Sequence, residues 1–143
     1  MTGALYRLSR ELAEGKTTAR ELTERSLSRI AETEQTLNAF ITVDCEGARR
    51  AAAESDARRA VGAPRSPFDG IPYAAKDNFE TAGLRTTCAS KLLEHHIPSR
   101  DAAAVETLRR AGFVLVGKTN MDEFAMGSVT AASAFGASHN PHD

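Results

Sequence analysis

The chain has 143 residues, of which 41% are hydrophobic and 26% charged, and its formal net charge is −1. This length and composition fit one globular domain with a buried core, and the near-neutral charge gives no electrostatic reason to expect direct binding to nucleic acid or to a membrane. Two distant cysteines predict neither a disulfide framework nor a metal knuckle and favour a reducing cytosol; we also find no signal peptide and no apolar run long enough for a membrane span.

The N-terminal part is predicted to be mainly helical. Leucines spaced on one side of residues 4–14 predict an amphipathic helix. Thr18, three residues before Glu21, forms the capping-box pattern that opens a second helix. A short strand is expected at 38–43 (NAFITV), followed by an Ala-rich, charged helix over 45–61. Arginine pairs in this last helix alternate with acidic residues, which indicates a solvated face rather than an RNA-binding patch.

Strands and helices alternate after a Gly- and Pro-rich loop at 62–70. The expected elements are a strand at 71–76, a short helix near 90–95, a helix at 101–111, a strand at 113–117 and a short helix near 120–124. This alternation indicates an α/β fold with parallel strand pairs. We expect a single domain with a mostly helical part over residues 1–61 and the start of an α/β core over 71–143.

The stretch GFVLVGKT (112–119) has the spacing of a phosphate-binding loop, G-x-x-x-x-G-K-[ST]. In such a loop the strand precedes the first glycine, and the residues between the glycines curl around the phosphates. Here those residues are Phe, Val, Leu and Val, which predict an extended strand. An extended strand cannot turn its N–H groups toward one anion. Gly112 is therefore expected to end the preceding helix, and no nucleotide site is predicted.

Lys76 is the candidate catalytic residue. It ends the apolar run IPYAA (71–75) and is followed by Asp77 and Asn78. The C-terminal end of a buried strand is where α/β enzymes place their sites. Burial there would lower the pKa of the lysine, so that a neutral amine could act as a base. The alternative is a solvated lysine just past the strand end, paired with Asp77.

Three segments carry a resemblance to a known family. They are DGIPYAAKDN (69–78), RTTCASKLLE (85–94) and GKTNMDEFAMGS (117–128). Together they resemble the amidase signature family. TNMDEFAMGS is similar to its tRNA-dependent branch, the A subunits of the glutamyl-tRNA(Gln)/aspartyl-tRNA(Asn) amidotransferases. The resemblance extends over nearly the whole chain and implies N-terminal helices followed by part of a mixed, largely parallel sheet.

This resemblance implies a Ser–cis-Ser–Lys catalytic triad in which Lys76 is the lysine. The implied substrate-binding residues are Ala125, Met126, Gly127 and Ser128. Two of these also have a purely structural interpretation, with Met126 in the core and Gly127 in a turn. The implied reaction releases ammonia from glutamine through a glutamyl-enzyme, and the ammonia then converts Glu-tRNA(Gln) or Asp-tRNA(Asn) to Gln-tRNA or Asn-tRNA.

The resemblance also implies partners and a compartment. The partners are the other members of a cytoplasmic heterotrimer, namely a tRNA-binding kinase/transamidase subunit with its small belt subunit, and the mischarged tRNA is bound indirectly. No cofactor or metal is expected in this chain, because ATP and Mg²⁺ would be used by the kinase/transamidase partner.

Two departures from the family pattern affect these expectations. Ala131 and Ala132 stand where the family commonly has an acidic and then a polar or aromatic residue, which predicts the loss of a polar support beneath the site. The Gly/Ser-rich signature with the bridging and nucleophilic serines is expected shortly after Pro141, and the sequence contains no such run. We therefore expect an N-terminal fragment that is inactive alone, with the apolar strand at 113–117 exposed at a sheet edge.

Two alternatives stay open at this point. One is an amidase of the same superfamily that acts on small carboxamides without tRNA. The other is a non-catalytic fragment whose N-terminal helices bind a partner.

Overall fold

The computed structural model describes residues 3–142, which form two compact units. The helical unit comprises residues 3–29, 44–73 and 107–116, and the loop unit comprises residues 30–43, 74–106 and 117–142. Each unit is described by itself below. The residues named as candidates for the site, 76 and 125–128, all belong to the loop unit.

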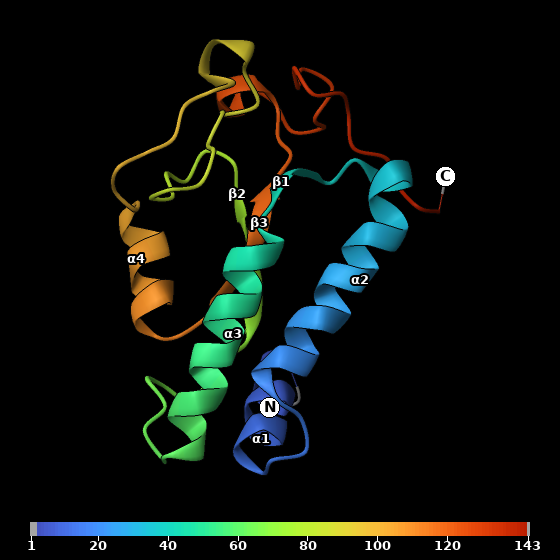
Figure 1. Ribbon diagram of the computed structural model, residues 1–143. Helices are drawn as coiled ribbons and strands as arrows, with labels where there is room; N and C mark the ends of the chain where they lie inside the picture. Colours follow the sequence, from blue (N-terminus) through green and yellow to red (C-terminus); the bar gives the residue numbers. More distant parts are fainter. Residues whose placement is uncertain (1–2, 143) are drawn as a thin grey trace. The chain divides into compact units, whose positions relative to one another are not determined.

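All of the helices and strands expected from the sequence are present (Figure 1). In chain order they are α1 (Ala4–Ala13), α2 (Ala19–Leu37), β1 (Phe40–Val43), α3 (Cys45–Ala60), β2 (Pro72–Lys76), η1 (Lys91–Leu93), α4 (Ala103–Arg110), β3 (Val114–Thr119) and η2 (Glu123–Ala125). The two short helices, η1 and η2, are single 3₁₀ turns. Among residues 3–142 every helix is too short or too polar to span a bilayer.

The predicted capping box opens α2. Glu21 N donates to Thr18 Oγ1 (3.1 Å), and Thr18 N donates to Glu21 Oε2 (2.9 Å). The carboxylate of Asp56 on α3 accepts from the next two backbone N–H groups, those of Ala19 (2.7 Å) and Arg20 (3.1 Å). The first backbone N–H groups of a helix have no acceptor within the helix. In α2 these groups donate to side-chain oxygens of Thr18 and Asp56 instead. The same contact fixes the start of α2 against the middle of α3.

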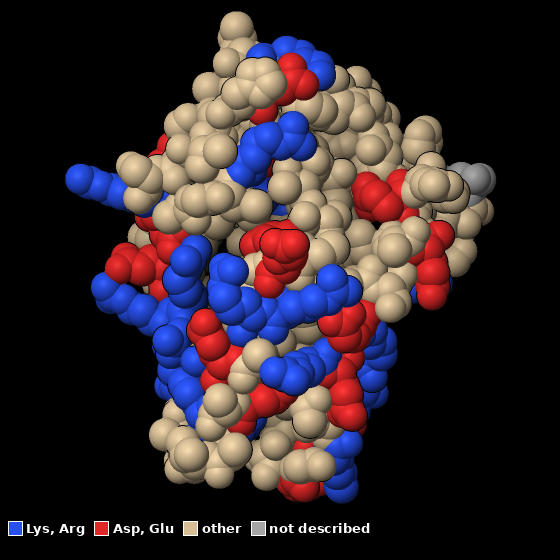
Figure 2. All heavy atoms as spheres, in the orientation of Figure 1, with Lys and Arg blue, Asp and Glu red and all other residues tan. Residues whose placement is uncertain are grey.

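In the helical unit, α3 approaches its neighbours through small side chains, since Ala48, Ala52 and Ser55 are fully buried. Two arginines of α3 form ion pairs within the chain, and Figure 2 shows Lys and Arg interleaved with Asp and Glu over the helices. Arg49 forms a two-bond pair with Glu24 of α2 at 2.6 and 2.9 Å. Arg58 forms the corresponding pair with the fully buried Asp69 at 2.9 and 2.7 Å. A pairing role explains these arginines without an RNA partner.

The three strands form one mixed sheet in the order β1-β3-β2. β1 is antiparallel to β3, with Val43 opposite Gly117. β2 is parallel to β3, because hydrogen bonds join Val114 N to Ile71 O (2.9 Å) and Asp77 N to Thr119 O (3.1 Å), in step along both strands. The expected mixed sheet is confirmed. The expected exposure of the 113–117 strand at an edge is wrong, because β3 lies between the other two strands.

The structure also excludes a phosphate-binding loop at GFVLVGKT. Gly112 ends α4 with a φ of +87°, where an L side chain would be strained. Gly117 and Lys118 belong to the extended strand β3, and the Lys118 side chain is fully buried. The backbone N–H groups of this stretch therefore do not converge on a common anion.

Candidate active site

The candidate site begins where β2 ends, in the loop unit. Along this strand Ala75 is buried, Lys76 is exposed and Asp77 is buried. Successive side chains of a strand point to opposite faces, so Lys76 and Asp77 point away from one another. Asp77 N donates to Thr119 O of β3 (3.1 Å), which holds the chain in extended form through this point.

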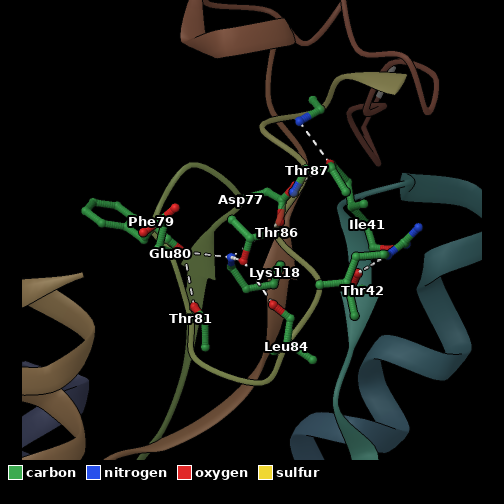
Figure 3. A network of polar contacts seen from close by, with 12 residues as sticks. Ile41, Thr42, Asp77, Phe79, Glu80, Thr81, Leu84, Thr86, Thr87 and Lys118 are labelled. Atoms are coloured by element: carbon green, nitrogen blue, oxygen red, sulfur yellow. Dashed lines mark hydrogen bonds and ion pairs between the residues drawn. The ribbon is translucent and has the colours of Figure 1, made fainter. Parts of the chain in front are cut away.

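The buried face is organised by Lys118 of β3 (Figure 3). Its Nζ donates to Phe79 O and to Thr86 Oγ1, both at 2.7 Å, and lies 3.4 Å from Asp77 Oδ1. An ammonium group has three N–H donors and no acceptor, so these three oxygens match its donors. The Lys118 and Asp77 side chains are both fully buried, and a buried charge is tolerated only with such partners.

Asp77 extends this network to the next segment of the loop unit. Its Oδ2 accepts from Thr87 N (2.8 Å) and Thr87 Oγ1 (2.5 Å), and its backbone oxygen accepts from Cys88 N (3.2 Å). Burial lowers the pKa of Lys118, and the Asp77 carboxylate opposes that shift. Burial, together with the Asp77 charge, also raises the pKa of the Cys88 thiol.

The exposure of Lys76 contradicts one expectation from the sequence. The reasoning required this amine to be withdrawn from water, yet its side chain is exposed in the described chain. The buried lysine with a lowered pKa is Lys118 instead. The alternative pairing of Lys76 with Asp77 is also wrong, because Asp77 points inward to Lys118.

The loop that carries the other candidate residues is built around the Asp122 carboxylate. Asp122 is buried and accepts three backbone N–H groups, from Val129 (3.0 Å), Thr130 (2.9 Å) and Ala132 (3.0 Å). Gly127 lies directly against it, since a Cβ at position 127 would lie 2.5 Å from Asp122 Cγ. A residue without a side chain is therefore needed at position 127 for the loop to close over the carboxylate.

Asp122 also connects Lys76 with this loop. Three backbone N–H groups, above all that of Ala132, hold the pKa of the Asp122 carboxyl below its ordinary value, and the charge of Lys76 lowers it further. Lys76 thus lies within electrostatic reach of the carboxylate on which Gly127 packs. Lys76 and the 125–128 segment are thus related through the Asp122 carboxylate.

The four expected substrate-binding residues, Ala125, Met126, Gly127 and Ser128, are all exposed. Met126 is 84% exposed, so its interpretation as a core residue is wrong. Phe124 and Ala125 have positive φ angles (50° and 62°), as do Cys88 and Ala89 (51° and 55°). Such strain in residues other than glycine persists only where the surroundings impose it, and it is often found at functional sites.

The two strained segments are bonded to each other. Phe124 N donates to Cys88 O (2.9 Å), Ala134 N donates to Ala89 O (3.0 Å), and Ser90 Oγ donates to Glu123 Oε1 (2.5 Å). The segment held by Asp77 and Lys118 is thereby joined to the loop built on Asp122. The loop unit thus carries an exposed lysine at the end of β2 and an exposed loop at 125–128, and both are related to the Asp122 carboxylate.

Sequence reasoning missed Lys118, Asp77 and Asp122 as organisers of this region. The sequence contained a signal for Lys118, because this lysine directly follows the apolar run FVLVG. A lysine at the end of a buried strand is expected to lose its contact with water, and the same argument was used for Lys76. The signal for Asp122 was weaker. An aspartate a few residues before a glycine and a run of small residues is a common turn pattern, and it does not reveal three converging N–H groups.

Comparisons with known proteins show which family the chain is similar to. The Amidase family model matches residues 21–143. The A subunit of a glutamyl-tRNA(Gln) amidotransferase from Roseiflexus sp. (strain RS-1) is 54% identical over 130 residues, which cover 91% of this chain and 26% of the relative. The chain therefore spans about a quarter of the length of that relative.

Solved structures show the same similarity. The native peptide amidase from Stenotrophomonas maltophilia superposes with a TM-score of 0.84 at 36% identity, over 92% of this chain and 28% of that one. The A subunit of the glutamyl-tRNA(Gln) amidotransferase from Thermotoga maritima superposes with a TM-score of 0.70 at 39% identity, over 87% of this chain and 25% of that one.

Proposed function

The chain belongs to the amidase family, and from this premise we propose that it supplies the lysine base and part of the carboxamide pocket of a glutamine-dependent amidotransferase. The observation that supports the proposal most strongly is the placement of Lys76. It stands at the C-terminal end of β2, within electrostatic reach of Asp122, and the 125–128 loop closes on that same carboxylate.

In the proposed mechanism Lys76 accepts a proton through a bridging serine, and a nucleophilic serine attacks the carboxamide carbon of glutamine. The proton returns through the bridging serine to the amide nitrogen, so that the C–N bond breaks and ammonia leaves as the acyl-enzyme forms. Water then attacks the ester, the nucleophilic serine takes back a proton through the same relay, and glutamate is released. The Lys76 side chain is exposed in the described chain, whereas a lysine base is expected to work where water is excluded. We therefore propose that a serine-bearing segment covers the Lys76 amine when it folds against the loop unit. The described residues alone do not provide that cover.

The chain contains no Gly/Ser-rich run that could supply the two serines, so we propose that the isolated chain is catalytically inactive. In the assembled enzyme, ammonia passes to a tRNA-binding kinase/transamidase subunit that activates Glu-tRNA(Gln) or Asp-tRNA(Asn) with ATP and Mg²⁺. A small belt subunit completes the proposed heterotrimer, and the tRNA-dependent reaction places it in the cytoplasm. The 54% identity to the amidotransferase relative from Roseiflexus supports these partners.

A second candidate is an amidase that acts on small carboxamides without tRNA. The TM-score of 0.84 to a peptide amidase, against 0.70 to the amidotransferase from Thermotoga maritima, favours it. The two candidates share the base and differ in the substrate. A fair comparison therefore measures ammonia released from glutamine and from a peptide with a C-terminal amide under the same conditions.

The proposal is tested with the isolated chain and with a chimera in which this chain replaces the matched segment of the Roseiflexus amidotransferase relative. We expect no ammonia release from glutamine by the isolated chain and measurable release by the chimera. Lys76→Met should abolish the activity of the chimera. Lys16→Met is the matched control, because the Lys16 side chain is 65% exposed and belongs to the helical unit. Turnover by the isolated chain, or a Lys76→Met chimera as fast as its parent, would contradict the proposal.

A further inference from the structure

Two lysines of the loop unit, Lys76 and Lys118, are the possible bases near the turn that follows β2. We propose that Lys118 is a positioning residue, which holds the turn so that Lys76 points to the 125–128 loop, and that Lys118 does not itself accept the proton. This inference rests on the proposed function for the part that concerns catalysis. The part that concerns geometry can be tested without any activity.

Lys118 is unsuited to be the base because its donors are all engaged. Its Nζ serves Phe79 O and Thr86 Oγ1 at 2.7 Å and faces Asp77 Oδ1 at 3.4 Å. A neutral amine keeps two N–H groups for Phe79 O and Thr86 Oγ1, but deprotonation would remove the positive charge that faces the buried Asp77 carboxylate. Asp77 Oδ1 has no hydrogen-bond partner in the described chain and depends on this ion contact. The Lys118 side chain is also fully buried, so a substrate cannot reach it.

The contacts of Lys118 join Asp77, the residue that follows Lys76, to two further points of the chain. Phe79 O lies on the far side of the turn, Thr86 lies on the segment that returns past it, and Asp77 is the residue next to Lys76 in sequence. Because neighbouring side chains of an extended chain point in opposite directions, drawing the Asp77 side chain inward directs Lys76 outward. Lys118 therefore sets the direction of the Lys76 side chain indirectly, through its contact with Asp77.

The same network reaches the loop built on Asp122. Asp77 Oδ2 holds Thr87, and the adjacent Cys88 accepts at its backbone oxygen from Phe124 N (2.9 Å). Phe124 lies two residues after Asp122. A displacement of the turn would consequently alter the separation between Lys76 and the Asp122 loop, and with it the position of the base relative to the proposed carboxamide pocket.

The main difficulty for a test is that Lys118→Met alone leaves the Asp77 carboxylate buried and without a counter-charge, and such a variant is prone to unfold. The informative variant is therefore the neutral double substitution Lys118→Met with Asp77→Asn, which removes both charges. Thr86→Val is a milder second variant, since it keeps both charges and the shape of the side chain and deletes two hydrogen bonds of the Thr86 hydroxyl, the one accepted from Lys118 Nζ (2.7 Å) and the one donated to Leu84 O (3.1 Å). Folding of each variant is checked by circular dichroism and cooperative unfolding.

The first measurement tests, in the isolated chain, whether the Lys76 charge stays close enough to the Asp122 carboxylate to lower its pKa. The pKa of the Asp122 carboxyl is followed by carbon-13 NMR with and without Lys76→Met. In the parent, removal of the Lys76 charge should raise the pKa of Asp122, because that charge lowers it. In the double variant the same substitution should leave the pKa unchanged, and in Thr86→Val it should have a reduced effect. An effect as large in the folded variants as in the parent would overturn the inference.

The second measurement uses the chimera and separates positioning from general damage. Misplacement of Lys76 should lower kcat for ammonia release by roughly 100-fold and leave KM for glutamine unchanged. If the parent chimera releases no ammonia, the proposed function is contradicted. The NMR comparison in the isolated chain then still tests whether Lys118 positions Lys76. If the folded double variant keeps the kcat of the parent, Lys118 does not position the base.

Discussion

Gly117→Ala would test the strand interpretation of GFVLVGKT directly. Gly117 lies opposite Val43 in the antiparallel pair, and a Cβ there would lie 2.4 Å from Thr42 O and 3.0 Å from Phe40 Cδ1. A carbon approaches a carbonyl oxygen to about 3.3 Å, so β1 would have to move by roughly 1 Å. The carbonyl belongs to the backbone of a paired strand and cannot rotate away.

The cost follows from the hydrogen bonds that such a shift breaks. A ladder bond of ordinary length stretched by about 1 Å no longer meets the geometry of a hydrogen bond. About two such bonds at about 1 kcal/mol each, with an overpacking cost of about 1–2 kcal/mol, give a destabilisation of about 3–4 kcal/mol. For a chain of this size we expect Tm to fall by roughly 10 °C.

The assay is thermal unfolding followed by circular dichroism, with Gly3→Ala as the matched control. No heavy atom lies within 4 Å of a Cβ placed at Gly3, so this variant should keep the Tm of the parent within about 1 °C. A phosphate-binding loop would instead leave room beside Gly117, because the second glycine of that motif approaches a ligand rather than a strand. Equal Tm values for the two variants would refute the close pairing of β1 and β3.

Three further outcomes are expected. Thr18→Ala removes the N-cap of α2 and should destabilise the chain by about 1 kcal/mol, measured by urea unfolding. The Asp122 carboxyl has a pKa below its ordinary value, so its stabilising effect is complete above the ordinary aspartate range and is lost as pH falls through the folded-state pKa. The protection of the 127–132 amides, measured relative to their intrinsic exchange rate at each pH, should therefore fall in acid, and Asp122→Asn should lower this protection only at neutral pH. Because the pKa of Cys88 is raised and Cys45 is exposed, iodoacetamide at pH 8 should modify Cys45 first, as read by mass spectrometry.

The elements of this fold could be predicted well from local patterns. The capping box at Thr18 and Glu21 and the β-branched run of β1 act over a few residues, so their physical causes are visible in the sequence. Gly112 could be recognised as a helix terminator for the same reason. Sheet order could not be predicted in this way, because the pairing of β3 with strands on both sides joins segments far apart in the chain. The expectation of an exposed edge was wrong for that reason.

The site shows the same division. Lys76 could be identified as a candidate because its position after an apolar run and the KDN motif are local features. Its solvent exposure could not be predicted. Side chains alternate along an extended chain, so only one of Lys76 and Asp77 points inward, and which one does so depends on the buried residue that it meets. That partner, Lys118, is more than 40 residues away in sequence. The anchoring of the 125–128 loop likewise depends on the backbone N–H groups of Val129, Thr130 and Ala132, which donate to Asp122. The order of side chains in the sequence does not indicate that these N–H groups point to one carboxylate.

The central claim is that the amine at position 76 performs the proton transfer. It is tested most directly by chemical replacement of that amine in the chimera. Lys76→Cys should release no ammonia from glutamine, and aminoethylation of the new thiol should restore activity, with the parent chimera treated in parallel to control for its other cysteines. The restored side chain is a weaker base because its sulfur withdraws electrons, so the acidic limb of the pH–rate profile should move to lower pH. Full activity of Lys76→Cys before alkylation, or no recovery after it in a folded enzyme, would contradict the account.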